Sequence, residues 1–128
     1  MNLAVVGWVA VGGALGTLAR YFGMIGIGRT LGTDFPWAVF LINIVGSIVI
    51  GVVAGLQALV FNNSETVRAF VVVGLLGGFT TFSSFSLDIW LLVERGQTLT
   101  ALLYAVGSVA LGVLGLVVGL HAVRLFAA

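Results

Sequence analysis

The chain has 128 residues, of which 61% are hydrophobic and only 7% carry a charge. Soluble domains carry about 25% charged residues, so this composition excludes an ordinary soluble domain and predicts a protein that lies in a bilayer. Five arginines against four acidic residues leave a net charge of +1, which excludes a basic nucleic-acid-binding surface. The absence of cysteine excludes disulfides, thiolate metal sites and cysteine nucleophiles.

Four apolar segments are long enough to cross a membrane, because a spanning helix needs about 20 residues. They are expected at residues 3–27, 37–61, 67–93 and 98–126, and they predict one all-α transmembrane domain. The short linkers between the segments force neighbouring spans to run antiparallel.

The first span is expected to be retained, because no basic region precedes it and no small-residue cleavage site follows it. Gly12 and Gly16 form a GxxxG pair, which is typical of close helix packing in lipid. Arg20 lies late in the span and has two interpretations. Its side chain can extend to the headgroups, or it can place a positive charge at the mouth of a pore.

The second span is expected to begin with Pro36 at the first helical position and Trp37 at headgroup level. Asn43 lies inside the span with apolar neighbours, and a lone amide at this depth needs a partner. It either joins two helices or donates to a passing ion. A stripe of small residues at four-residue spacing begins at Ser47 and favours close packing.

The third span begins with Ser64 as a plausible N-cap and is then expected to break. Gly77 and Gly78 weaken the helix, and the hydroxyls that follow compete for its carbonyls. Non-helical backbone at membrane depth is tolerated only where it is buried in protein or lines a wet cavity. The break therefore marks a candidate site, and its free carbonyls resemble those that hold sodium in transporters.

Phenylalanine recurs every three residues after the break, at Phe79, Phe82 and Phe85. Such a stripe can be simple packing, but hydroxyl residues fill nearly all the positions between the rings. The edge of an aromatic ring is positive, so edges that face a cavity could attract an anion without trapping it. Asp88, near the end of the span, is interpreted as a partly solvated interfacial acid.

The fourth span follows a helix stop at Gly96. Tyr104 and Ser108 lie one turn apart on it and are its main polar residues at depth. Ser108 and Gly112 form another pair of small residues. The chain has 19 glycines, more than the packing of a single four-helix bundle needs, so a homodimer is expected.

Arginine is spread almost evenly between the two sides of the membrane. Arg68 and Arg124 lie on one side, and Arg29 and Arg95 lie on the other, joined by Arg20 if it reaches the interface. Orientation follows the imbalance of basic residues between short loops, and this near tie leaves two alternatives. The chain inserts both ways and pairs antiparallel, or its few charges tie by coincidence.

Three motifs resemble those of the fluoride channels of the Fluc (CrcB) family: GGALGTLARY in the first span, NIVGS in the second and GLLGGFTTFSSFS in the third. The resemblance covers essentially the whole chain. It implies a passive, highly selective channel in the cell inner membrane that exports cytoplasmic fluoride and confers fluoride resistance, and not an enzyme. HF would enter from acidic surroundings, ionise in the cytoplasm, and leave as the anion through the pore.

The resemblance also implies an antiparallel dual-topology homodimer with two fluoride pathways, each built from both subunits. Backbone carbonyls of Gly77 and Thr80 would hold a structural sodium ion at the dimer interface. The implied partners are fluoride, a second copy of the chain and the lipid bilayer, with no nucleic acid. A heterodimer with a different subunit remains the alternative.

By motif position, the ring edges of Phe82 and Phe85 would face the fluoride, and Asn43 would be the pore asparagine. Arg20 would be the basic residue of the first span, at the pore vestibule. The remaining implied pore residues are the hydroxyl contributors Thr81, Ser83 and Ser84, and the start of a polar track at Tyr104 and Ser108. Gly112 departs from family members that carry a hydroxyl there.

Two rival classes explain less of the sequence. Small multidrug resistance exporters are also four-span dual-topology proteins, but they need a carboxylate inside the first span, where this chain has Gly13, Ala14 and Leu15. A non-transporting membrane assembly protein would use the small-residue stripes but leaves the hydroxyls of the third span unexplained. An intramembrane enzyme would need paired carboxylates, a cysteine or a well-placed histidine beside the serines.

Overall fold

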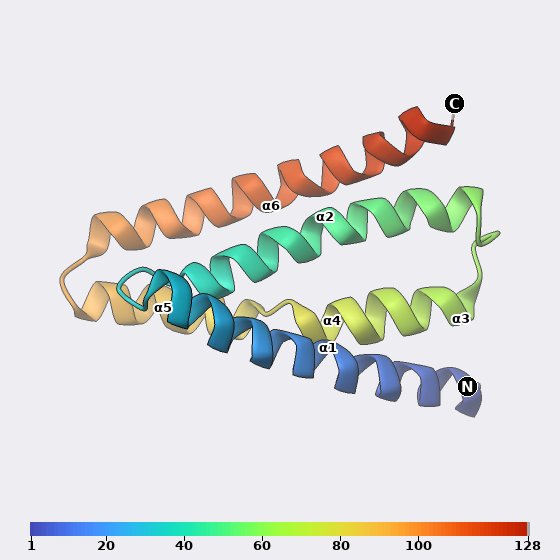
Figure 1. The fold of residues 1–128 in the computed structure, drawn as a ribbon, viewed down its shortest axis with the longest axis horizontal. Coiled ribbons are helices and arrows are strands. Elements are labelled where there is room, and N and C mark those ends of the chain that lie inside the picture. The colour runs from blue at the N-terminus through green and yellow to red at the C-terminus, as the bar shows by residue number, and fades with distance from the viewer. Residues whose placement is uncertain (128) are drawn as a thin grey trace.

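Four long helical segments, each apolar enough to cross a membrane, make up almost all of residues 1–127, the part of the chain that this computed structural model describes (Figure 1). The helices are α1 (Leu3–Leu31), α2 (Trp37–Leu59), α3 (Glu65–Val67), the π-helix η1 (Arg68–Leu76), α4 (Gly77–Phe79), α5 (Phe82–Glu94) and α6 (Thr98–Ala127). The segments α3, η1, α4 and α5 together form the third span, Glu65–Glu94. An all-α protein with four helices of spanning length is therefore confirmed.

Local side-chain chemistry sets the ends of several helices. The Ser64 hydroxyl accepts a hydrogen bond from the Val67 N–H at 3.3 Å, which confirms the predicted N-cap. Gly96 has φ of 78°, a left-handed conformation that glycine adopts freely, and it confirms the predicted stop. Pro36 lies one residue before α2 rather than inside it. The first helix continues four residues beyond its expected end at residue 27, to Leu31.

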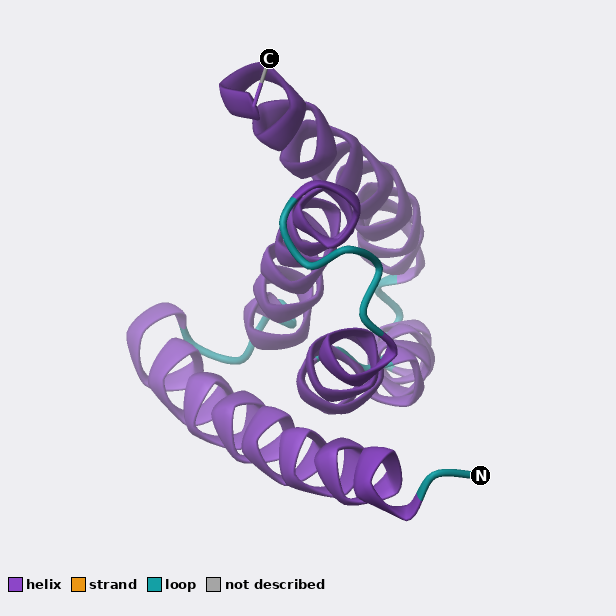
Figure 2. Ribbon diagram, turned by 90° about the vertical axis from the view of Figure 1, so that its right-hand side faces the viewer, coloured by secondary structure: helices purple, strands orange, loops and turns teal. Residues whose placement is uncertain are grey.

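The spans are arranged in antiparallel order, as their short connections require. Both termini and the α2–α3 connection lie at one end of the bundle, and the α1–α2 and α5–α6 connections lie at the other (Figure 1). The helices α1 and α6 lie on opposite sides, with α2 and the third span between them (Figure 2). The most extensive packing joins α2 to α6 and α1 to η1.

Close backbone approach explains the packing of α1 against η1. A Cβ added at Gly16 would collide with the Leu75 carbonyl oxygen, and one added at Gly74 would lie 2.8 Å from the Val9 carbonyl oxygen. Packing of this kind is how helices associate in lipid, where there is no hydrophobic drive between them. The π-helix is uncommon at this length, and π-helical turns often lie at functional sites.

The core of the bundle is small and aromatic. Its buried cluster consists of Val39, Phe85, Leu92, Ala101 and Tyr104, with Tyr104 only 1% exposed. Large apolar side chains instead cover the outer faces, as at Phe22 on α1 and Val113 on α6. An apolar exterior of this extent fits a lipid environment rather than water.

Candidate functional site

The backbone of the third span is not helical between α4 and α5. Thr80 has φ of −83° and ψ of 158°, and Thr81 has φ of −150° and ψ of 122°, so both residues are extended. An extended pair interrupts the helical ladder and leaves polar backbone groups that need other partners. The side chains of Asn43, Arg20 and Thr81 provide these partners.

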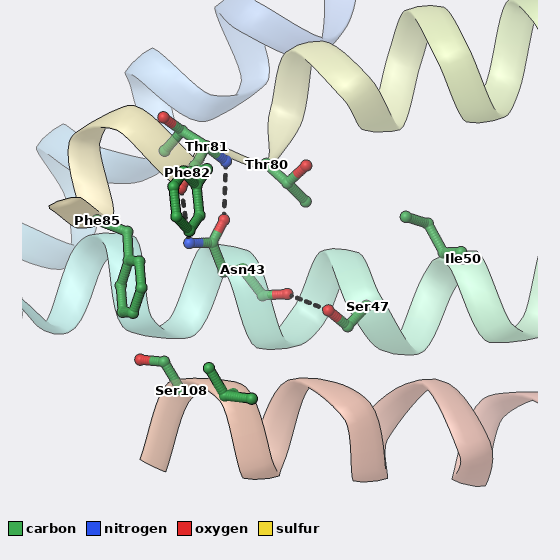
Figure 3. Close-up of a pocket in the computed structure, with 9 residues that line it drawn as sticks. Asn43, Ser47, Ile50, Thr80, Thr81, Phe82, Phe85 and Ser108 are labelled. Atoms are coloured by element: carbon green, nitrogen blue, oxygen red, sulfur yellow. Dashed lines mark hydrogen bonds between the residues drawn. The ribbon is translucent and has the colours of Figure 1, made fainter. Parts of the chain in front are cut away.

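Asn43 on α2 binds the backbone of Thr81 with both ends of its amide. Its Nδ2 donates to the Thr81 carbonyl at 2.9 Å, and its Oδ1 accepts from the Thr81 N–H at 2.8 Å (Figure 3). This pairing replaces the helical bonds that the extended backbone has lost. An amide nitrogen carries two hydrogens, so one remains available to a ligand. Both interpretations of Asn43, a link between helices and an ion donor, are compatible with this geometry.

Arg20 on α1 forms a hydrogen bond with a second backbone group at the break. Its Nε donates to the Gly78 carbonyl at 3.1 Å. In a continuous helix that carbonyl would accept from the N–H of Phe82, four residues later. Arg20 is half-buried and engaged with the protein, so its charge lies at the break.

Two further carbonyls lose their helical partners. The N–H that would bond to the Gly77 carbonyl belongs to Thr81 and donates to Asn43 instead. The N–H that would bond to the Thr80 carbonyl belongs to Ser84 and donates to the Thr81 hydroxyl at 3.2 Å. The oxygens of Gly77 and Thr80 are therefore released from the helix, and bare carbonyl oxygens are ligands that hard cations prefer.

The Thr81 side chain begins the next helix. Its hydroxyl caps α5 by accepting from Ser84, and it lies 3.4 Å from the Ser83 hydroxyl. The Thr80 hydroxyl donates back to the Leu76 carbonyl at 2.9 Å. Part of the hydroxyl-rich sequence thus serves to shape the break.

A cavity of about 260 Å³ opens beside the break (Figure 3). It is formed between α2, the extended segment, α5 and α6. The residues that line it are Asn43, Ser47, Ile50, Thr80, Thr81, Phe82, Phe85, Ser108 and Val109. The cavity therefore combines amide and hydroxyl groups with aromatic rings and aliphatic side chains.

Ser108 brings an unused hydroxyl to the cavity. Its oxygen is buried and has no hydrogen-bond partner among residues 1–127. A buried hydroxyl without a partner is costly, so this group suits a polar ligand. The Ser47 hydroxyl, by contrast, donates to the Asn43 carbonyl at 2.8 Å.

The two phenylalanines differ sharply in exposure. Phe82 is 78% exposed and Phe85 is 8% exposed, and their ring centroids lie 5.8 Å apart with planes at 49°. Both rings line the cavity. Phe85 also contacts Tyr104, with a centroid separation of 5.2 Å.

The structure brings together six of the residues that the sequence singles out: Asn43, Thr80, Thr81, Phe82, Phe85 and Ser108. Arg20, Gly77, Ser83, Ser84 and Tyr104 do not line this cavity. Tyr104 instead donates its hydroxyl to Asp88 at 2.9 Å. Ser47, Ile50 and Val109 were not identified as cavity residues from the sequence. Ser47 lies one helical turn after Asn43, and Val109 follows Ser108, so both could have been found from their neighbours.

A family model described as CrcB-like protein, Camphor Resistance (CrcB), matches residues 7–120. The chain belongs to the CrcB-like family. A fluoride-specific ion channel FluC from Rhodospirillum centenum is 53% identical over 116 residues, which cover 91% of this chain and 92% of the relative. One from Nitrobacter winogradskyi is 50% identical with the same coverage. One from Rhizobium leguminosarum bv. trifolii is 46% identical over 119 residues, 93% of this chain and 95% of the relative.

Membership of the CrcB-like family and the four apolar helices give the same coarse description. The chain is a multi-pass membrane protein. The matched region includes the whole break, every residue that lines the cavity, and most of the helices around them.

Proposed function

We propose that this chain is a passive, selective fluoride channel. The observation that carries the proposal is a cavity with unused hydrogen-bond donors beside a broken membrane helix, in a chain about half identical to fluoride-specific ion channels. Fluoride that leaves a cell through such a channel needs no energy coupling, because the anion formed from HF inside the cell flows down its own gradient. The role is therefore transport and protection from fluoride rather than catalysis.

The cavity has groups that can replace fluoride's water. Moving a bare ion into a low-dielectric interior would cost tens of kcal/mol. The free amide hydrogen of Asn43, the Ser108 hydroxyl and the positive edges of the two rings offer compensation in small steps. Several weak contacts allow an ion to bind and still leave.

The functional unit in this proposal is an antiparallel homodimer in the cell inner membrane. Phe82 lines the cavity and is 78% exposed, so in a single subunit the polar wall would open towards lipid. Polar groups at membrane depth are tolerated where protein or a wet cavity covers them. A second copy placed over Phe82 would close the cavity and contribute to its lining.

A structural sodium ion fits the break in the same proposal. The carbonyls of Gly77 and Thr80 have lost their helical donors, and Gly77 is exposed. Two such carbonyls from each subunit would give an all-oxygen site, which is the ligand chemistry that sodium uses at unwound transporter helices. When bound, the ion would supply positive charge that holds the two breaks together.

Ion release from liposomes tests the channel proposal. Purified protein is reconstituted into vesicles loaded with the potassium salt of fluoride or of chloride, and a potassium ionophore carries the balancing charge. Fluoride should leave rapidly and chloride hardly at all, as followed with ion-selective electrodes. Equal rates for the two ions, or no release above that of loaded vesicles without protein, would refute the proposed function.

A further inference from the structure

A second cavity, of about 280 Å³, also borders the core, through Val39 and Leu92. It is lined by the end of α1, the α1–α2 connection, the start of α2 and the end of α5. Its lining includes Val39 and two charged residues, Asp88 and Arg95. It shares no lining residue with the cavity beside the break.

Three side chains in contact bridge the two cavities. Phe85 lines the first cavity and contacts Tyr104 with a centroid separation of 5.2 Å. Tyr104 is 1% exposed and donates its hydroxyl to the Asp88 Oδ2 at 2.9 Å. Asp88 lines the second cavity. Tyr104 and its bond to Asp88 therefore lie between a residue that lines one cavity and a residue that lines the other.

The hydrogen bond limits what Tyr104 can offer to an anion. A tyrosine has a single O–H hydrogen, and here a carboxylate oxygen takes it. A carboxylate and fluoride are both anionic acceptors of short, strong hydrogen bonds, so they compete for the same hydrogen. Arg95 lines the same cavity and offers the carboxylate a positively charged partner when it leaves Tyr104.

We propose that Asp88 is a tethered anion that occupies the Tyr104 hydroxyl between the two cavities and must release it before fluoride can bind there. Asp88 is thus a positioning residue, since it acts on the ion through Tyr104. In this proposal the second cavity is a vestibule of the fluoride pathway, and the pathway continues from it to the cavity beside the break. This inference rests on the proposed fluoride channel function. Fluoride can bind only while the hydroxyl is free. Its apparent affinity is therefore the intrinsic affinity multiplied by the fraction of time that the hydroxyl is free.

A double-mutant cycle in liposomes tests the inference. Fluoride release is measured at increasing fluoride for the wild type, Asp88→Ala, Tyr104→Phe and the double variant. Asp88→Ala frees the hydroxyl, so half-maximal release should occur at a roughly tenfold lower fluoride concentration, the size expected for one hydrogen bond to a charged group. In the Tyr104→Phe background the same change should have no effect, because there is no hydroxyl to release.

Three results would overturn the inference: an unchanged half-maximal concentration in Asp88→Ala, an increased one, or the same decrease with and without the Tyr104 hydroxyl. The last would mean that Asp88 acts only through its charge. Glu94→Ala is the matched control, because Glu94 is an acid on the same helix that bonds Trp90 at the exposed surface, at 2.9 Å. It should behave as the wild type.

Asp88→Asn covers the case in which Asp88→Ala does not fold, as judged by gel filtration. Its neutral amide oxygen still accepts from Tyr104 but more weakly, so the shift should keep its direction with a smaller size and again disappear in Tyr104→Phe. A wild type that fails to release fluoride would overturn the channel function and this inference together. If the wild type releases fluoride selectively but the effects of Asp88→Ala and Tyr104→Phe simply add, this inference alone is overturned.

Discussion

Asn43, Phe82 and Phe85 are the single residues that contribute most to the proposed fluoride site. Asn43 braces Thr81 with the oxygen and the nitrogen of its single side-chain amide, which leaves the second hydrogen of that nitrogen for a ligand in the cavity. Phe82 and Phe85 face the same cavity but have different surroundings, because one is exposed and the other is part of the core. The two rings can therefore be separated by experiment.

Replacing either ring with isoleucine should lower fluoride release about tenfold, because bulk is kept while the positive ring edge is lost. Phe85→Ile should also lower the midpoint of thermal unfolding, since Phe85 packs against Tyr104 in the core, whereas Phe82→Ile should leave the unfolding of a single subunit unchanged. Release from liposomes and unfolding in detergent measure the two effects. Phe22→Ile, at an exposed position on α1, is the control. Full release in both cavity variants would mean that the rings serve only for packing.

The third span shows at the scale of elements which features a sequence can predict. Two glycines followed by two threonines predict an interruption, and the structure has Thr80 and Thr81 extended. The partners of that interruption could not be predicted, because Arg20 and Asn43 are 58 and 38 positions away from the groups they bind. Nothing local specifies such pairings; they depend on how α1 and α2 pack.

The π-helix and the second cavity were not predicted for the same reason. The sequence of η1 reads as an ordinary apolar helix, and its wider turn accompanies close packing against the glycines of α1. Asp88 is predicted to be a partly solvated interfacial acid, and it is partly exposed, but its bond to Tyr104 could not be predicted because it depends on the register of α5 against α6. Helix ends were more predictable, because Ser64 and Gly96 act through local chemistry.

Packing of α1 on η1 can be tested with one methyl group. In Gly16→Ala the new Cβ meets the Leu75 carbonyl, which is backbone and cannot rotate away. The free energy of unfolding should fall by about 1–3 kcal/mol, the usual cost of overpacking. Gly7→Ala is the matched control on the same helix, because no atom lies within 4 Å of its added Cβ. Equal stability of the two variants in detergent would contradict this packing.

At the scale of the whole molecule, the exposed Phe82 and the near-even arginines are the features that a dual-topology homodimer would explain. The absence of cysteine makes the orientation easy to measure with single introduced thiols. Asn63 and Gln97 lie in connections at opposite ends of the bundle, between α2 and α3 and between α5 and α6.

Cells that express Asn63→Cys or Gln97→Cys are treated with a thiol reagent that does not cross the membrane. If the chain inserts in both orientations, about half of the copies should react in each variant, because the basic residues give almost no bias. Permeabilised cells give the value for complete labelling. Complete reaction of one variant with none of the other would establish a single fixed orientation.

Removal of sodium tests the ion at the proposed dimer interface. Purification in choline salts should lower the thermal midpoint of the dimer and weaken fluoride release, since the Gly77 and Thr80 carbonyls would face one another without a cation. Restoring sodium should reverse both effects. Identical stability and release in the two salts would show that the released carbonyls hold no structural sodium.

Current through the reconstituted protein in a planar bilayer shows whether the protein conducts fluoride passively. With fluoride on one side and chloride on the other, a passive fluoride channel should carry a current without any added gradient of protons or nucleotide, and its reversal potential should follow the fluoride gradient. A reversal potential that follows chloride, a current that requires a proton gradient, or no current from protein that is folded and dimeric would contradict the account.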